Sequence, residues 1–163
     1  DGFSLVLIDP ASNPDHSDPL NWRPSVAHHG TPTGTDATTF SGDALADLDK
    51  DGVPALLEYG LGSSDDTPHD SILPISSFSM FDFGSGLEPA LAFTFIRNLS
   101  ADDLIFTVEL SNDLNDWATS PGELIHLSSL NNGDGTSSET YIIAAPVSAE
   151  VQKFARLKTT LKE

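Results

Sequence analysis

One acidic stretch, from Asp47 to Glu58, constrains this chain more than any other part of its sequence. It reads D-L-D-K-D-G-V-P-A-L-L-E. A 12-residue calcium-binding loop needs carboxylates at positions 1, 3 and 5, a glycine at position 6, a backbone carbonyl at position 7 and a glutamate at position 12. The residues at these positions are Asp47, Asp49, Asp51, Gly52, Val53 and Glu58.

The closely spaced carboxylates of this stretch repel one another, and a hard divalent cation would offset the repulsion. The sequence therefore predicts a Ca²⁺ site. Its ligands are the side chains of Asp47, Asp49, Asp51 and Glu58 and the carbonyl of Val53. Asp43 and Asp65 flank the loop and would contribute through water. The alternative is a solvated acidic turn that precedes a helix.

A short helix is predicted directly after the loop, from Pro54 to Leu61, with Gly60 and Gly62 available to end it. No helix is predicted before the loop, because residues 40–45 are few and include glycine. A single loop without an entering helix or a partner loop is better suited to a structural metal than to a switch.

The charge and composition of the chain restrict its partners. Seven Lys and Arg residues against 25 Asp and Glu residues give a net charge of −18, which argues against binding to nucleic acid or to anionic membranes. No apolar run reaches the roughly 20 residues of a membrane-spanning helix, so membrane insertion is not expected. The chain has no cysteine, which excludes disulfides and thiolate metal sites.

Changes in composition divide the chain into three predicted segments. Residues 1–37 contain two short strand-like stretches, Phe3 to Ile8 and Asn21 to Val26, and end in a polar linker. Residues 38–72 hold the calcium loop and its helix. Residues 73–163 form the third segment. The first residues are strand-like and lack a methionine, as expected for a piece of a longer protein.

The third segment is predicted to be an antiparallel β-sandwich, because six stretches of alternating or continuous apolar residues follow one another at short spacing. Between two of them, residues 131–135 read N-N-G-D-G, which strongly indicates a hairpin. The six predicted strands are Ile75 to Phe83, Leu91 to Ile96, Leu104 to Leu110, Leu124 to Leu130, Thr140 to Ile143 and Phe154 to Thr160. In the third of these, Leu104 and Val108 belong to the buried face and Glu109 to the opposite face.

The stretch from Phe40 to Asp65 resembles the dockerin-like or thrombospondin type 3-like calcium linkers that precede the C-terminal modules of large secreted bacterial proteins. The β-rich segment after it is similar to the modules that follow such linkers. The resemblance implies an extracellular or cell-surface location and the ligand set given above. Lys50 is a departure, because these linkers commonly carry glycine or another small residue there.

Residues 2–10, G-F-S-L-V-L-I-D-P, and 21–25, N-W-R-P-S, resemble the closing strands of a lamin-tail-like domain, which is an immunoglobulin-like sandwich. The expected fold class is therefore mainly β, an antiparallel immunoglobulin-like β-sandwich with one short helix after a calcium loop. An incomplete sandwich would leave open strand edges that pair with other protein segments or subunits.

Other chemistry in the sequence is weaker. His28 and His29 are adjacent, but a transition-metal site needs further ligands. The pairs Asp65-Asp66 and Asp102-Asp103 could suggest glycoside hydrolysis, yet both lie in turn-like sequence and are expected to be solvated loop acids. No hydrolase motif is found, so no enzyme activity is expected.

Two functions remain as expectations. The first is a non-enzymatic, calcium-stabilised structural or assembly module that anchors or presents a larger secreted or surface protein. The second is a carbohydrate-binding accessory module of a polysaccharide-degrading enzyme. Trp117 is the possible glycan-binding residue, because an aromatic ring in a turn can stack on a sugar.

Overall fold

The computed structural model describes residues 2–68, 72–119, 122–149 and 152–163. Within these ranges the chain forms eight β-strands, all paired antiparallel, and one α-helix. The strands are β1 (Leu5–Leu7), β2 (Trp22–Pro24), β3 (Ile75–Asp82), β4 (Leu87–Asn98), β5 (Leu104–Ser111), β6 (Leu124–Asn131), β7 (Thr136–Pro146) and β8 (Phe154–Leu161). The helix is α1 (Ala55–Leu61), and short 3-10 helices cover Pro10–Ser12, Pro19–Asn21 and Val147–Ala149.

The largest sheet has four strands in the order β3-β4-β7-β6. Its central strand β4 is buried on both faces, because Phe93 and Phe95 point to one side while Ala90 and Ala92 pack on the other. The N-N-G-D-G turn joins β6 to β7, where the N–H of Asn132 donates to the carbonyl of Thr136 at 3.0 Å. The predicted hairpin is therefore confirmed.

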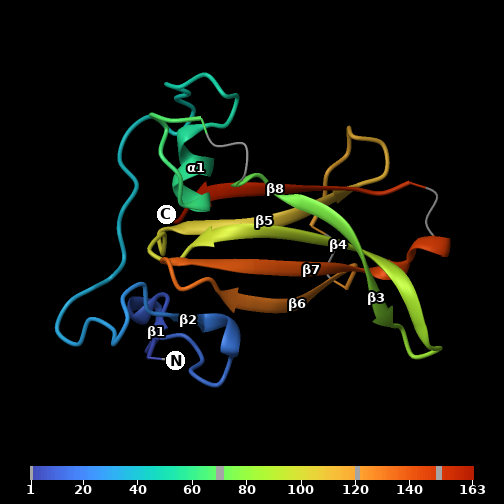
Figure 1. Cartoon of the computed structure of the whole chain (residues 1–163), viewed down its shortest axis with the longest axis horizontal. Coiled ribbons are helices and arrows are strands. Elements are labelled where there is room, and N and C mark those ends of the chain that lie inside the picture. The colour runs from blue at the N-terminus through green and yellow to red at the C-terminus, as the bar shows by residue number, and fades with distance from the viewer. Residues whose placement is uncertain (1, 69–71, 120–121, 150–151) are drawn as a thin grey trace.

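A second sheet consists of β5 and β8 and lies next to the larger sheet (Figure 1). Side chains of the two sheets form one core. Phe93 and Phe95 of β4 pack there with Val108 of β5, and Leu157 of β8 lies against them. The alternation of apolar residues predicted both the strands and this shared core, since each strand has one face that must be covered.

Glu109 of β5 differs from the prediction, because it is buried rather than exposed on the outer face. It lies opposite Arg156 in the β5–β8 register, and the Arg156 Nη2 is 2.7 Å from Glu109 Oε2. The cross-strand ion pair allows the carboxylate to be covered.

Helix α1 packs between the sheets at one end of the molecule. Leu61 is buried in the shared core, and Gly62 ends the helix in a left-handed conformation with φ of 88°. Gly60 lies inside the helix instead of ending it. A Cβ atom on Gly60 would lie 3.0 Å from Leu104 Cδ1, so only glycine allows the helix to approach β5 this closely.

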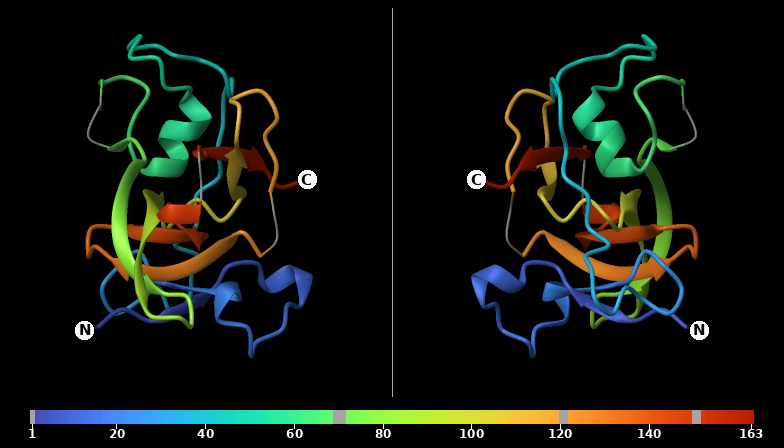
Figure 2. Two further views of the ribbon diagram at one scale, coloured as in Figure 1. Left: turned by 90° about the vertical axis from the view of Figure 1, so that its right-hand side faces the viewer. Right: turned by 90° about the vertical axis from the view of Figure 1, so that its left-hand side faces the viewer.

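The β1–β2 pair forms a separate two-stranded sheet on the opposite side of the larger strands from α1 (Figures 1 and 2). Arg23 of β2 is buried and joins this pair to the rest of the chain, because its Nη2 is 2.5 Å from Asp102 Oδ2 and 2.8 Å from Asp36 Oδ1. The described residues include no helix long and apolar enough to cross a membrane.

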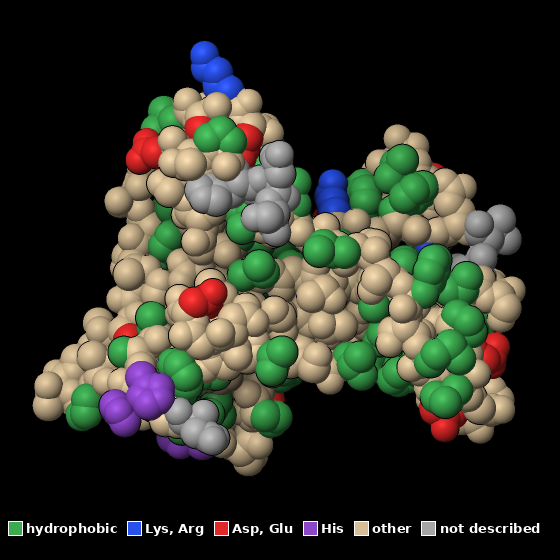
Figure 3. Space-filling model, in the orientation of Figure 1, with side chains coloured by type: hydrophobic (Ala, Val, Ile, Leu, Met, Phe, Trp, Pro, Cys, Tyr) green, Lys and Arg blue, Asp and Glu red, His purple; other side chains and the backbone are tan. Residues whose placement is uncertain are grey.

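Strand β3 lies at an edge of the four-stranded sheet and carries large apolar side chains that are open to solvent. Phe78 is 72% exposed and Met80 57%, and Leu87 at the start of β4 is exposed beside them. Figure 3 shows hydrophobic side chains gathered over the part of the molecule that holds this hairpin. The sheet formed by β5 and β8 therefore does not cover the hairpin of β3 and the start of β4.

Candidate metal centre

The loop brings three of the predicted ligands together. One carboxylate oxygen from each of Asp47, Asp49 and Asp51 lies within 4.8 Å of the others. Oxygen atoms at such spacing can share one cation, and carboxylate oxygens are the ligands that Ca²⁺ and Mg²⁺ prefer. The cluster lies in the turn between residues 46 and 54, above the N-terminal end of α1 (Figure 1).

Backbone hydrogen bonds orient these carboxylates. Oδ1 of Asp49 accepts the N–H of Asp51 at 3.1 Å, and Oδ1 of Asp51 accepts the N–H of Val53 at 2.8 Å. Oδ2 of Asp47 accepts the N–H of Gly52 at 3.3 Å. Aspartate at every second position makes such local bonds readily, which turns the loop back on itself and directs the side chains to its inside.

Two residues of the loop have positive φ, as a tight turn requires. Gly52 has φ of 90° and Lys50 has φ of 65°. The left-handed conformation suits glycine but strains a residue with a Cβ atom. Glycine would adopt the conformation of Lys50 without this strain.

Glu58 is fully buried at 0% exposure, although it carries an ionisable carboxyl group. Oε1 accepts the hydroxyl of Ser63 at 3.0 Å, whereas Oε2 is buried without any hydrogen-bond donor among the described residues. Oδ2 of Asp49 is likewise buried without one. A buried carboxylate oxygen without a donor is costly, and a bound cation would satisfy it.

Burial raises the pKa of Glu58, and the charges of Asp49, Asp51 and Asp65 raise it further, although the hydroxyl of Ser63 opposes the change. The group of ligating oxygens within 4.8 Å of one another comprises Asp47, Asp49 and Asp51 and does not include Glu58. The chemistry of these four carboxyl groups fits a hard divalent cation. Val53, the predicted carbonyl ligand, is buried at the base of the loop.

The loop is fastened at both ends. The carbonyl of Ala46 accepts the N–H of Ala55 at 2.8 Å, which joins the entry of the loop to the first residue of α1. Oδ1 of Asp65 accepts the N–H of Leu48 at 2.8 Å, so Asp65 holds the loop from the far side of the helix. Asp43 instead bonds locally, accepting the N–H of Leu45 at 3.0 Å.

Tyr59 of α1 connects the loop region to the β-sheets. Its hydroxyl donates to Oδ1 of Asp103 at 2.9 Å, and Oδ2 of Asp103 accepts the N–H of Phe40 at 2.7 Å. Burial raises the pKa of Tyr59 to about 12, and Asp103 raises it as well while Thr38 opposes the shift. The polar stretch before the loop is thereby fixed to the turn before β5.

The acidic pair Asp102-Asp103 is engaged in these contacts, with Asp102 bound to Arg23 and Asp103 to Tyr59. The expectation of solvated loop acids was therefore wrong for this pair. Both carboxylates serve as acceptors that join distant segments, and the sequence carried no sign of their partners.

Trp117 lies in the loop after β5 and is half-buried. Its Nε1 donates to the carbonyl of Leu114 at 3.0 Å, and the guanidinium carbon of Arg156 lies 4.3 Å from the ring centroid. Arg156 therefore covers the ring on one side, at a distance typical of a cation–π contact.

The paired histidines lie at the N-terminal segment, away from the aspartate loop. The rings of His28 and His29 are in edge contact at 4.2 Å, and Phe3 contacts the first of them. Among the described residues, the acidic loop is the one group of close metal-ligating side chains.

Comparisons of the chain with family models, with curated proteins and with solved structures give no match. Functional inference therefore depends on the residues themselves.

Sequence reasoning missed the residues that support the loop from outside it. Ser63 reaches Glu58 only because α1 ends in the tight turn at Gly62, which returns the chain toward the helix. The fixed spacing of the loop identified its acidic residues, whereas a supporting hydroxyl five residues beyond the last ligand has no characteristic pattern.

Proposed function

We propose that the chain is a non-enzymatic extracellular module in which one Ca²⁺ stabilises the loop from Asp47 to Glu58. The observation that carries the proposal is the convergence of three aspartates in a loop whose twelfth residue, Glu58, has a buried Oε2 without a donor among the described residues. The ligands would be these carboxylates and the carbonyl of Val53.

Calcium is favoured over magnesium by the number of oxygen donors. Four carboxyl groups and one carbonyl suit the six to eight ligands that Ca²⁺ takes in flexible geometry. Mg²⁺ demands a smaller octahedral site and keeps several waters. The bound ion would also offset part of the charge repulsion in a chain of net charge −18.

A structural role follows from the position of the loop. Its last ligand lies on α1, and α1 also supplies Leu61 to the core and Tyr59 to the contact with Asp103. We infer that metal binding stiffens the connection between the polar stretch before the loop and the β-sheets. The resemblance to calcium linkers of secreted proteins supports an extracellular or cell-surface location.

The finer fold class belongs to the same proposal. We infer an immunoglobulin-like arrangement for the β-sheets and a lamin-tail-like origin for the β1–β2 pair. The exposed apolar residues Phe78 and Met80 on edge strand β3 support assembly by strand pairing with another protein segment or subunit.

A thermal melt with light scattering tests the calcium proposal. The melting temperature is measured in Ca²⁺, in Mg²⁺ and in chelator for the wild type and for Glu58→Ala. We expect Ca²⁺ to raise the melting temperature of the wild type and to have little effect on the variant. Glu123→Ala, which removes an exposed carboxylate in the turn before β6, is the matched control.

An identical melting temperature in Ca²⁺ and in chelator would contradict the calcium proposal and leave an acidic turn. The molar mass obtained from light scattering tests for assembly independently of the melting temperature. A mass that rises with concentration and falls in Phe78→Ser would support strand pairing through β3.

Carbohydrate binding is the second proposed function, and Trp117 is the observation that favours it. The ring is partly exposed, in a loop, and held by both Leu114 and Arg156, so it could serve as a fixed stacking surface. Glycan-array binding that disappears in Trp117→Ala would support this function. If the chain binds no glycan on the array, carbohydrate binding is contradicted and the structural role is favoured.

A further inference from the structure

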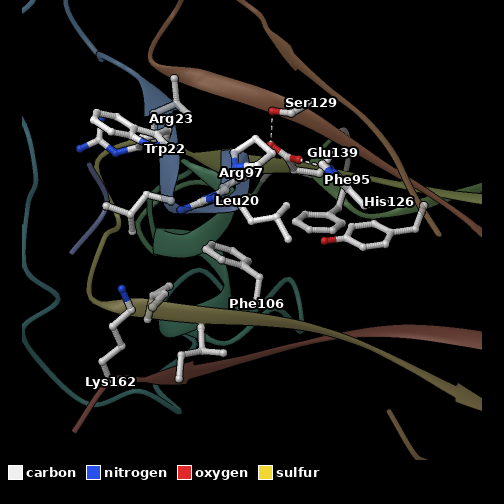
Figure 4. Close-up of a pocket in the computed structure, with 16 residues that line it drawn as sticks. Leu20, Trp22, Arg23, Phe95, Arg97, Phe106, His126, Ser129, Glu139 and Lys162 are labelled. Atoms are coloured by element: carbon white, nitrogen blue, oxygen red, sulfur yellow. Dashed lines mark hydrogen bonds and ion pairs between the residues drawn. The ribbon is translucent and has the colours of Figure 1, made fainter. Parts of the chain in front are cut away.

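A cavity of about 360 Å³ lies between the two sheets, on the side away from the metal loop. Residues of β4, β5, β6 and β7 form its walls, and Leu20 and Trp22 of the N-terminal segment close it on one side (Figure 4). Its volume is in the range of sites for small molecules.

Arg97 of β4 is the decisive residue of this cavity, because it has no ion-pair partner among the described residues. Its Nε is out of contact with solvent and has no hydrogen-bond acceptor there. The guanidinium carbon lies 5.4 Å from the centroid of the Phe106 ring. Burial lowers the pKa of Arg97, since the charged form loses hydration, and the charge of Glu139 in the same cavity is the largest effect that opposes this.

Glu139 lines the same cavity, but its oxygen atoms are already engaged. Oε1 accepts the hydroxyls of Ser129 at 2.7 Å and Ser137 at 2.6 Å, and Oε2 lies 2.9 Å from His126 Nε2. Figure 4 shows the contacts to Ser129 and His126 directed away from the Arg97 side chain. The guanidinium therefore has no direct carboxylate partner among the described residues, and its Nε is shielded from solvent.

Most of the cationic side chains in the described chain pair with a carboxylate, whereas Arg97 does not. Of its seven Lys and Arg residues, Arg23, Lys153, Arg156 and Lys158 form ion pairs with carboxylates. Lys50, Arg97 and Lys162 form none among the described residues, and the last two line this cavity. In a chain with 25 acidic residues, two cations that face a single hollow without carboxylate partners indicate a place for an anion.

Aromatic rings supply the rest of the lining. The Phe95 ring is stacked between Phe106 and Tyr141, with centroid distances of 5.9 Å and 6.1 Å. These stacked rings line the cavity, and the guanidinium lies over the ring of Phe106. A ligand that fits both features has an anionic group at one end and an apolar, planar body at the other.

We propose that the cavity between the sheets binds a small organic carboxylate, with its carboxyl group on Arg97 and its apolar body against Phe106 and Tyr141. Arginine favours carboxylate because its planar fork donates two parallel hydrogen bonds. Lys162 at the same cavity adds positive charge. The site is independent of the metal loop and of the function proposed above.

Benzoate is a suitable probe, and benzyl alcohol is its uncharged counterpart of similar shape. Binding to the whole chain in Ca²⁺ buffer is followed by calorimetry and by amide and ring chemical shifts. We expect saturable benzoate binding with shifts at His126 and Ser129, at least tenfold tighter than benzyl alcohol. Acetate, which lacks the apolar body, should bind more weakly than benzoate.

Two variants assign the site. Arg97→Met should reduce benzoate affinity at least tenfold, and Arg97→Lys should reduce it less, because charge is kept and the fork is lost. Arg156→Met, which changes an arginine outside the cavity, should leave the affinity unchanged. Thermal melts show whether each variant is folded.

Three results would overturn the proposal: no saturable binding of benzoate, equal affinity for benzoate and benzyl alcohol, or unchanged affinity in a folded Arg97→Met. The first two comparisons use the wild-type chain, so they decide the matter even if the arginine variants do not fold.

Discussion

Arg23 holds Asp102 across 79 residues of sequence, with Nε 2.7 Å from Oδ1 and Nη2 2.5 Å from Oδ2. The geometry is the two-pronged arginine–carboxylate pair, the strongest type of ion-pair contact. Asp36 accepts from the same guanidinium at 2.8 Å. One buried arginine therefore unites the β1–β2 pair, the stretch before the loop and the turn before β5.

Arg23→Met should destabilise the chain by about 3–5 kcal/mol, because it leaves the carboxylates of Asp36 and Asp102 covered without their partner. Urea unfolding at neutral pH measures the change. Lys153→Met is the control, since the Glu123 side chain with which Lys153 pairs is 51% exposed and the pair should contribute about 1 kcal/mol or less. Equal losses in the two variants would contradict the role assigned to Arg23.

The same cluster predicts a pH dependence. Burial alone would raise the pKa of Asp36, but hydrogen bonds from Arg23 and from the N–H of Val26 outweigh it, so the pKa lies below the ordinary value of 3.8. A lowered folded-state pKa means that Asp36 stabilises the fold above pH 3.8 and that this contribution is lost as the pH falls through the folded value. The stability difference between wild type and Asp36→Asn should therefore shrink below pH 3.8. Urea midpoints across the acid range measure it, and a constant difference would be inconsistent with the shift.

Glu58→Gln should have opposite effects with and without metal. In chelator at neutral pH it should be at least as stable as the wild type, because a raised folded-state pKa means that the ionised Glu58 opposes folding above the ordinary value of 4.5. In Ca²⁺ the variant should be less stable, since the amide is a poorer ligand than the carboxylate. Paired thermal melts test this, and a loss of the same size in both buffers would rule out a metal role for Glu58.

Lys50→Gly should strengthen calcium binding. It removes a positive charge from the loop and relieves a residue with φ of 65°, a conformation that costs about 1–3 kcal/mol for non-glycine residues. The greater freedom of glycine in the unfolded chain offsets part of this gain, by about 0.5–1 kcal/mol. Calorimetric titration with Ca²⁺ gives the affinity. Lys50→Met separates the causes, because it removes the charge and keeps the strain.

Gly60→Ala should destabilise the fold by about 1–3 kcal/mol, as overpacking commonly does, even though alanine favours helix. The added Cβ would meet Leu104 Cδ1 at 3.0 Å and Phe106 Cε1 at 3.1 Å. Gly34→Ala is the matched control, because its Cβ would meet only Thr31 Cγ2 at 3.9 Å. Chemical denaturation compares the two, and a stabilised Gly60→Ala would show that β5 can yield to the helix.

The sequence predicted local features well. The alternation in Leu104 to Leu110 and the N-N-G-D-G turn depend on neighbours in the chain, and β5 and the β6–β7 hairpin lie where expected. The acidic loop could also be predicted from a short stretch of sequence, because Asp47, Asp49 and Asp51 alternate with other residues in one turn and converge there.

The contacts between distant segments could not be predicted in this way. The pairing of Arg23 with Asp102, and of Glu109 with Arg156, depends on the register and packing of strands that are far apart in sequence. Residues of four strands and of the N-terminal segment line the cavity around Arg97, so no single stretch of sequence indicates it.

Helix α1 places Glu58 and Leu61 one turn apart, the first at the acidic loop and the second in the core shared by both sheets. Opening the loop therefore displaces a residue on which the sheets pack. Amide protons of the loop, of α1 and of the adjoining part of β4 should exchange with solvent as one cooperative unit, so that a cation bound at the surface slows the opening of the interior.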